Sequence, residues 1–465
     1  MSQQLEKRTY NEILKKLINL KLNLMKRNIL VIIFLAAFTH LFGQGTDYII
    51  FKKGNSFIAK NRISGSEELK HKDASVLIQK VLNNFQGIGG KIELLSGKYP
   101  ITNQLNIPNH VTISGSGAST VLEIAKTAEI ESALYSDSTS KVTIQDLTIT
   151  SEDSKKTQSG IIFTNVGDCL IKDVFITGMG AYGIWFRGYC FLSEIRGCKI
   201  SDSGKSGILL QATTKNLKSR AGDYLFNLIT NCIIYGGNYG IELQKTICTN
   251  IVACQVFMTK SAGFYINGAN STLISGCRTY QIQDDAIRAI KSHELNVSSN
   301  IFCWHVGHGI SLDNVIWGTI TGNNFIDNGH INIVPENVNT AHYLTNVPDN
   351  INVLDSLKCG IFATNQTKGV TVSGNAIFNW GSNLPLKYGI HEDSSCSDNI
   401  ITGNNIDFFH NQGILSEGTN TKESNNLSTK ETFIGKENES KKFHWYAPQR
   451  LQKFIEETRK PFDTK

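Results

Sequence analysis

The chain has 465 residues, including 40 Gly but only 7 Pro, and a formal net charge of +6. This composition is typical of many short strands joined by tight turns and argues against a helical bundle. No basic stripe alternates with aromatic residues, so nucleic-acid binding is not expected, and the charge balance is sufficient for solubility.

Residues 1–44 are predicted to lie outside the folded domain. Met25-Lys26-Arg27 precedes an apolar segment from Ile29 to Phe38, and small and polar residues follow. These are the parts of a secretory signal, and the apolar segment is too short to span a bilayer. We therefore expect export to the periplasm or the medium of a Gram-negative bacterium, without stable membrane insertion. Residues 1–24 are then expected to precede the true start of the translated protein.

The N-terminal part of the domain predicts two short strands, a helix and two further strands. The strands lie within 48–60, and the helix covers 73–85, with Asp73 as N-cap and an apolar face of Val76, Leu77, Val81, Leu82 and Phe85. The runs GGKIELLSGKY (89–99) and VTISGSG (111–117) follow. With the helix, these runs resemble the opening of the pectin lyase-like superfamily. The resemblance implies a right-handed parallel β-helix capped by a helix, and activity on polysaccharides.

A repeat supports the same fold. Small residues followed by alternating apolar residues recur roughly 23 residues apart, and such a period indicates a solenoid. The repeat starts are Gly160, Gly183, Gly207, Gly240, Gly263, Ala286, Gly309, Gly360, Gly389 and Gly413. The fold class is therefore an all-β parallel β-helix of about 10–12 coils. It is assigned to residues 45–420, with two long insertions after Gly207 and Gly309.

Residues 421–465 are predicted to be a polar linker and a short C-terminal amphipathic helix. This helix either caps the last coil or forms an oligomer interface, so the protein is expected to be a monomer or a homo-oligomer.

The ten cysteines are interpreted mainly as buried thiols. Cys198, Cys254 and Cys277 occupy the turn position that Asn231, Asn300, Asn323, Asn375 and Asn404 take in other repeats. Stacked amides at such turns satisfy backbone groups. A disulfide between Cys254 and Cys277 is geometrically possible, because adjacent coils are about 4.8 Å apart.

Alternation along the first strand of each repeat predicts two outward-facing columns. The first column is Ile162, Trp185, Leu209, Glu242, Tyr265, Arg288, Ser311, Phe362 and His391, and the second is Thr164, Arg187, Gln211, Gln244, Asn267, Ile290, Asp313, Thr364 and Asp393. We expect them to line one groove. The candidate catalytic residues are Arg288, Tyr265, His308, Asp313, Asp285 and Asp284. The candidate substrate-binding residues are Arg187, Trp185, Glu242, Gln244, Asn267, His305 and Lys291.

Three functions remain open. The first is β-elimination on a uronic-acid glycan by a polysaccharide lyase or an oligosaccharide dehydratase. In this reaction Arg288 neutralises the uronate, and Tyr265 and His308 supply the base and the acid. The second rests on a local resemblance of Asp284-Asp285 and Gly307-His308-Gly309 to polygalacturonases, which implies hydrolysis by paired carboxylates. The third is a non-catalytic glycan-binding β-helix.

The expected partner is an acidic glycan, and no cofactor is expected. Calcium would be the ion to consider, since some pectin lyase-like proteins use it to bridge a uronate. Glu242 and Asp313 lie too far apart along the solenoid to form a compact set of oxygen ligands.

Overall fold

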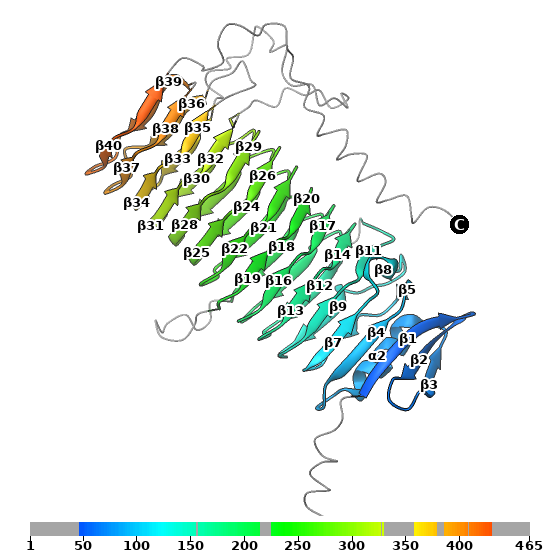
Figure 1. Ribbon diagram of the computed structural model, residues 1–465. Helices are drawn as coiled ribbons and strands as arrows, with labels where there is room; N and C mark the ends of the chain where they lie inside the picture. The colour runs from blue at the N-terminus through cyan, green and yellow to red at the C-terminus, as the bar shows by residue number, and fades with distance from the viewer. Residues whose placement is uncertain are drawn as a thin grey trace, which may run out of the picture.

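The computed structural model describes residues 46–154, 157–213, 225–326, 328–329, 358–378, 386–407 and 409–429. These residues form one stack of coils bounded by three long sheets, and the colours in Figure 1 run in order along the stack. The predicted right-handed parallel β-helix is confirmed. The predicted signal segment, most of the two insertions and the predicted C-terminal helix lie outside the described residues.

Each coil adds one strand to each sheet in turn. Sheet A contains β3 (Glu67–His71), β2 (Ser56–Asn61), β1 (Thr46–Lys53), β4 (Gly90–Leu94), β7 (Val111–Ser114), β10 (Thr143–Gln145), β13 (Leu170–Lys172), β16 (Glu194–Arg196), β19 (Leu228–Thr230), β22 (Asn250–Val252), β25 (Asn270–Ser275), β28 (His293–Ser298), β31 (Ile316–Thr321), β34 (Lys368–Ser373), β37 (Ile400–Thr402) and β40 (Lys422–Ser424).

Sheet B follows sheet A along each coil. It contains β5 (Gly97–Ile101), β8 (Thr120–Ile124), β11 (Thr148–Ser151), β14 (Phe175–Thr177), β17 (Lys199–Ser201), β20 (Ile233–Tyr235), β23 (Gln255–Phe257), β26 (Arg278–Tyr280), β29 (Ile301–Cys303), β32 (Asn324–Ile326), β35 (Ala376–Phe378), β38 (Asn405–Asp407) and β41 (Leu427–Thr429). A 3₁₀ turn, η1 (Gly117–Ser119), precedes β8.

Sheet C completes each coil and carries the predicted site. It contains β6 (Leu105–Asn106), β9 (Ser132–Asp137), β12 (Ser159–Thr164), β15 (Ile184–Arg187), β18 (Ser206–Gln211), β21 (Tyr239–Gln244), β24 (Phe264–Asn267), β27 (Ile287–Ile290), β30 (Ile310–Asp313), β33 (Ile361–Thr364), β36 (Leu386–Glu392) and β39 (Phe409–Ser416).

Helix α2 (Ala74–Asn84) covers the first coil, as expected. The Asp73 carboxylate accepts a hydrogen bond from the Val76 N–H at 3.1 Å and so caps the helix. The buried face differs from the prediction at two positions, because Ile78 is buried and Val76 is only half-buried. The antiparallel strands β1, β2 and β3 lie beside the helix at this end of the stack.

The small residues that open each repeat are explained by backbone contact between coils. A Cβ atom at Gly183 would lie 2.6 Å from the Gly207 carbonyl oxygen, and one at Gly360 would lie 2.7 Å from that of Gly389. Both distances are shorter than real contacts, so a side chain would push the coils apart. The small residues recur because a larger side chain at these positions would prevent the coils from stacking closely.

The column of stacked Asn and Cys side chains at the turns, here called the turn ladder, was predicted correctly except at one coil. Cys232, and not Asn231, occupies the buried position between Cys198 and Cys254, and its thiol donates to the Ile195 carbonyl. Asn231 lies in the left-handed region at φ 54° and is exposed. All ten cysteines are free thiols, so the Cys254–Cys277 disulfide is absent.

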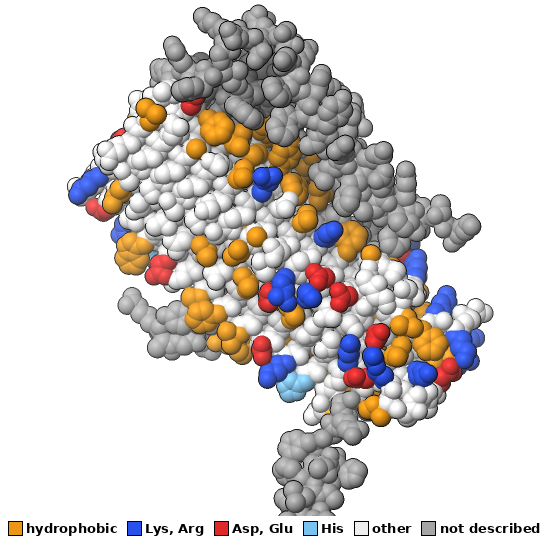
Figure 2. Space-filling model, viewed as in Figure 1, with side chains coloured by type: hydrophobic (Ala, Val, Ile, Leu, Met, Phe, Trp, Pro, Cys, Tyr) orange, Lys and Arg blue, Asp and Glu red, His pale blue; other side chains and the backbone are white. Residues whose placement is uncertain are grey.

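The solenoid extends beyond the predicted boundary at residue 420. Strands β40 and β41 continue the coils to Thr429, with Asn426 as the last member of the turn ladder. On the face shown in Figure 2, Lys and Arg side chains lie among Asp and Glu side chains, most densely near the N-terminal end. Over the described ranges, the one helix that forms is far too short and polar to traverse a bilayer.

Candidate active site

The two predicted columns on sheet C are present in the predicted register. Glu242 pairs with Tyr265, Tyr265 with Arg288, and Arg288 with Ser311, through strands β21, β24, β27 and β30. Their neighbours two residues along form the second column, which includes Gln244, Asn267, Ile290 and Asp313. In β24, β27 and β30, buried and partly exposed residues alternate, so both columns point away from the core.

Arg288 is the centre of a charge cluster. Its Nη2 lies 2.6 Å from Asp284 Oδ2, and its Nε lies 2.9 Å from Asp285 Oδ2. Both aspartates lie in the turn before β27, and this turn places their side chains against the Arg288 side chain. Among the described residues Nη1 has no hydrogen-bond partner, so this edge of the guanidinium is available to a ligand.

The two aspartates differ in environment. The Asp284 side chain is 32% exposed, and burial together with the Asp285 charge raises its pKa, against the opposing effect of Arg288. Asp285 is only 2% exposed. A half-buried carboxyl with a raised pKa is suited to donate a proton.

Asp285 has no unused side-chain oxygen. Oδ1 accepts the His308 backbone N–H at 2.8 Å, while Oδ2 accepts the Ser311 hydroxyl at 2.6 Å in addition to Arg288 Nε. Three hydrogen bonds compensate the cost of burying this carboxylate. Asp285 is therefore a positioning residue whose hydrogen bonds connect β27 to the turn before β30.

His308 lies beside this cluster in a defined tautomer. The Cys359 N–H donates to His308 Nδ1 at 3.0 Å, so in the neutral ring the proton is on Nε2. Burial lowers the His308 pKa to about 4. The ring stacks on Phe362, with centroids 5.0 Å apart. At neutral pH His308 is thus a hydrogen-bond donor through Nε2.

His305 does not belong to this surface, and its predicted role in substrate binding was wrong. The ring is fully buried, with Nδ1 accepting the Ile282 N–H at 3.1 Å and Nε2 lying 2.8 Å from the Thr279 hydroxyl. His305 therefore stabilises the bend after sheet B. Lys291, by contrast, is exposed in the turn after β27, at the margin of sheet C.

Tyr265 and Glu242 occupy neighbouring places in the first column. The Tyr265 hydroxyl accepts a hydrogen bond from Asn267 Nδ2 at 3.3 Å, and its ring stacks on Tyr239, with centroids 4.6 Å apart. Glu242 is 6% exposed and is bonded to Ser206 and Gln244. Glu242 therefore contributes to the structure of the face more than to an open binding site.

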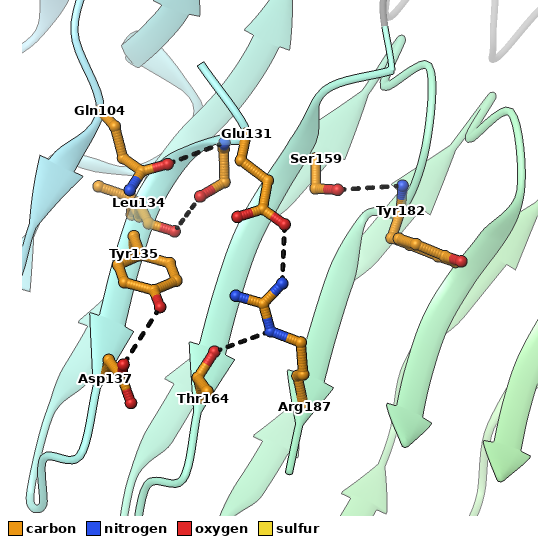
Figure 3. A network of polar contacts seen from close by, with 10 residues as sticks. Gln104, Glu131, Leu134, Tyr135, Asp137, Ser159, Thr164, Tyr182 and Arg187 are labelled. Carbon is orange, nitrogen blue, oxygen red and sulfur yellow. Dashed lines mark hydrogen bonds and ion pairs between the residues drawn. The ribbon is translucent and has the colours of Figure 1, made fainter. Parts of the chain in front are cut away.

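Asp313 and Arg187 lie farther from the charge cluster. Asp313 accepts from Asn365 Nδ2 at 3.0 Å, one coil further along. Arg187 forms an ion pair with Glu131 at 2.8 Å, and its guanidinium lies 4.9 Å from the Trp185 ring centroid. Figure 3 shows Arg187 extending between Glu131 and Thr164 on the N-terminal coils of sheet C. These residues share the face but not the cluster.

Two contributors to the site were not predicted as site residues. Tyr239 precedes the small residue Gly240, outside the alternation that defined the columns. Ser311 was placed in the first column, but its bond to Asp285 depends on a turn one coil away. No pattern within one repeat reveals either contact.

The described residues contain no group of three or more His, Cys, Asp or Glu side chains arranged to hold a metal ion.

The family model for a right-handed β-helix region matches residues 109–272 and 221–377. No curated protein matches the chain. The solved structures that resemble it include the A-module of the mannuronan C-5 epimerase AlgE6 from Azotobacter vinelandii, which is 14% identical. That match covers 77% of this chain and 96% of the module, with a TM-score of 0.58.

Two other solved structures are similar over most of their length. DFA-IIIase from Arthrobacter chlorophenolicus, in complex with GF2, is 14% identical, with 71% of this chain and 90% of that chain covered and a TM-score of 0.54. The periplasmic alginate epimerase AlgG is 11% identical, with coverages of 73% and 77% and a TM-score of 0.50. At these identities the similarity establishes the fold alone.

Proposed function

Because the chain belongs to the right-handed β-helix family, we propose that it is a carbohydrate-active enzyme that cleaves a uronic-acid-containing glycan by β-elimination. One observation carries the proposal. The Arg288 guanidinium is held by two aspartates, and its Nη1 is unpaired among the described residues. It lies between the Tyr265 strand and a half-buried Asp284 whose pKa is raised.

Each part of the reaction has a residue suited to it. The uronate carboxylate binds the open edge of Arg288, which makes the C5 proton more acidic and stabilises the charge that develops on the carboxylate. The Tyr265 phenolic oxygen is the base that takes the C5 proton. The C5 electron pair then forms the C4–C5 double bond, the C4–O bond breaks, and Asp284 transfers its proton to the departing oxygen.

His308 and Asp285 support these steps without exchanging protons. The Nε2–H of neutral His308 donates a hydrogen bond to a substrate oxygen, because Nδ1 is occupied by the Cys359 N–H. Asp285 fixes the orientation of Arg288 and Ser311. If the group leaving C4 is a sugar, the enzyme is a lyase, and if it is water, the enzyme is a dehydratase.

Hydrolysis by Asp284 and Asp285 is supported less well. Glycosidases of that kind need two carboxyl groups that reach the substrate or its attacking water. Asp285 is 2% exposed and its oxygens are occupied by three donors. Asp284 alone is open, which suits a single proton donor.

The names of two similar structures suggest a substrate class to test first. Both are epimerases, one of mannuronan at C5 and one of alginate. Removal of a C5 proton is common to epimerisation and elimination. The two reactions differ in whether C5 is then reprotonated or the bond to the C4 oxygen breaks. Alginate and polygalacturonate are therefore the first substrates, with inulin as an uncharged control.

The experiment follows three products in parallel, with Asp284→Asn as the control of strongly reduced activity. Elimination gives the ultraviolet absorbance of a conjugated C4–C5 double bond in the wild type and far more slowly in the variant. New reducing ends without absorbance would indicate hydrolysis, and a changed epimer ratio in an uncut chain would indicate epimerisation. Binding without any product would leave a glycan-binding protein. Each of these three results would overturn the proposed reaction.

A further inference from the structure

The face of sheet C continues well beyond the charge cluster toward the N-terminal coils. Strand pairing extends the first column from Tyr265 back through Glu242, Leu209, Trp185 and Ile162 to Tyr135. The second column extends in the same register through Gln244, Gln211, Arg187 and Thr164 to Asp137. The two columns lie side by side across six coils.

The columns differ in chemistry in a regular way. The partly exposed side chains of the first column are the rings of Tyr135, Trp185 and Tyr265, because Ile162, Leu209 and Glu242 are buried. Every member of the second column can form hydrogen bonds. In the second column, Gln211 Nε2 donates to Gln244 Oε1 at 2.7 Å, so neighbouring amides are already aligned. A sugar chain has a similar division, with apolar C–H faces and hydroxyl edges.

Arg187 organises the aromatic residues at the far end of this surface. Its guanidinium lies 4.9 Å from the Trp185 ring centroid and 6.0 Å from that of Tyr135. Glu131, at 2.8 Å, and the Thr164 hydroxyl, at 3.1 Å from Nε, fix its position (Figure 3). Tyr182 packs against Trp185, with centroids 4.9 Å apart.

We propose that Tyr135, Trp185 and Arg187 form an outer sugar-binding subsite for a glycan chain whose reacting unit lies at Arg288. The assignment deepens the proposed function and rests on it for the position of the reacting unit. Trp185 is three strand pairings from Tyr265, or about 14 Å at about 4.8 Å per strand. A chain must therefore extend several sugar units beyond the reacting unit to reach the subsite.

The occupant is a glycan because the subsite has stacking rings and hydrogen-bonding groups but little uncompensated charge. The Arg187 charge is paired with Glu131, so an anionic group is not required for binding. Aromatic rings supply contact area at low conformational cost, and the preformed contacts of Arg187 keep them ordered. The subsite therefore selects for chain length more than for charge.

The test compares Trp185→Ala with Trp317→Ala. Trp317 lies in β31 of sheet A and is 60% exposed, so its removal controls for the loss of an exposed indole. On alginate and polygalacturonate polymers, Trp185→Ala is expected to raise KM about tenfold, the loss expected for one buried aromatic contact. The increase should shrink as shorter oligosaccharides are used. An equal effect at every length, or no effect on the polymers, would overturn the subsite.

A binding assay tests this subsite independently of the proposed reaction. Affinity electrophoresis in gels containing alginate, polygalacturonate or inulin measures retardation without any turnover. If no product forms but Trp185→Ala reduces retardation relative to Trp317→Ala, the reaction fails and the subsite stands. If the unmodified protein is not retarded by any of the three glycans, or both variants behave alike, the subsite is wrong.

Discussion

The Asp285 carboxylate accepts a hydrogen bond from Arg288 Nε at 2.9 Å. The two residues are three positions apart in the sequence, and Asp285 is buried whereas Arg288 is half-exposed. The same carboxylate accepts the His308 backbone N–H from the next coil. A single buried group therefore sets both the direction of the guanidinium and the stacking of the turn that carries His308. Much of the candidate site depends on this connection.

Replacement of Asp285 should therefore damage both stability and activity. In Asp285→Asn the amide cannot accept three hydrogen bonds in the same orientation, and Arg288 loses a charged partner. We expect a loss of about 2 kcal/mol in the free energy of unfolding, the scale for a buried charged hydrogen bond. Urea denaturation measures the loss, and kcat should fall more than KM rises.

Asp313→Asn is the matched control for this change. Asp313 lies on the same face, is half-exposed and has one described side-chain hydrogen bond, to Asn365. Its replacement should change stability by less than about 0.5 kcal/mol, as for ordinary surface substitutions. Equal losses in the two variants would contradict the central position of Asp285.

Asp284 should determine how activity falls as pH rises. Its pKa is raised by burial and by the Asp285 charge, and the reaction uses its protonated form. Activity should therefore decrease as pH rises through this pKa, and Asp284→Asn should lower kcat about 10²–10⁴-fold, as for loss of a general acid. The pH profile of kcat would contradict the assignment if the residual activity of the variant kept the same decrease.

The sign of the stability effect is also fixed for Asp284. A carboxyl whose pKa is raised on folding contributes stability below its unfolded pKa, and this contribution is lost as pH rises through the folded pKa. At neutral pH, Asp284→Asn should therefore not lower Tm. A clear decrease in Tm would show that the ion pair with Arg288 outweighs the cost of burying the carboxylate.

His308 has the opposite pH dependence. Its pKa is lowered to about 4, so between that value and its ordinary value the folded ring stays neutral while the unfolded chain takes up a proton. Stability from this group is present above the unfolded pKa and is lost as pH falls toward the folded one. His308→Gln should flatten the decrease in Tm on acidification. The exposed His293 provides the control, and identical profiles for the two Gln variants would contradict this role.

The asparagine ladder should be more important for stability than for function. Asn323 accepts the Asn300 N–H at 3.0 Å and donates to the Val297 carbonyl at 3.0 Å. Asn323→Ala leaves both backbone groups buried without their partner, at a cost of about 1–3 kcal/mol each. The exposed Asn103→Ala is the control. Equal urea midpoints for the two variants would show that the ladder is not a stabilising element.

The sequence was sufficient to predict the coils and the two columns on sheet C. Side chains in a strand alternate with a period of two, and the spacing of small residues such as Gly183 and Gly360 fixes how coils stack. Once the repeat was recognised, the pairing of Tyr265 with Arg288 followed directly. Strand positions were predictable because both regularities are local.

Residues in bends were predicted less well, because alternation does not determine where their side chains point. His305 was expected on the surface but lies in the core, and Asn231 was expected in the ladder place that Cys232 occupies. The contacts of Asp285 join two coils through a bend. Such contacts depend on how bends stack in three dimensions, which one repeat of sequence does not specify.

The most direct test of the central claim is an ultraviolet time course with wild type and Arg288→Ala on alginate and polygalacturonate. Arg288 lies on the outer face of β27, so the variant should keep the β-sheet circular dichroism of the wild type. The proposed site predicts that absorbance from the C4–C5 double bond rises with wild type and not with the variant. Near-wild-type activity in a folded Arg288→Ala variant would contradict the proposed site.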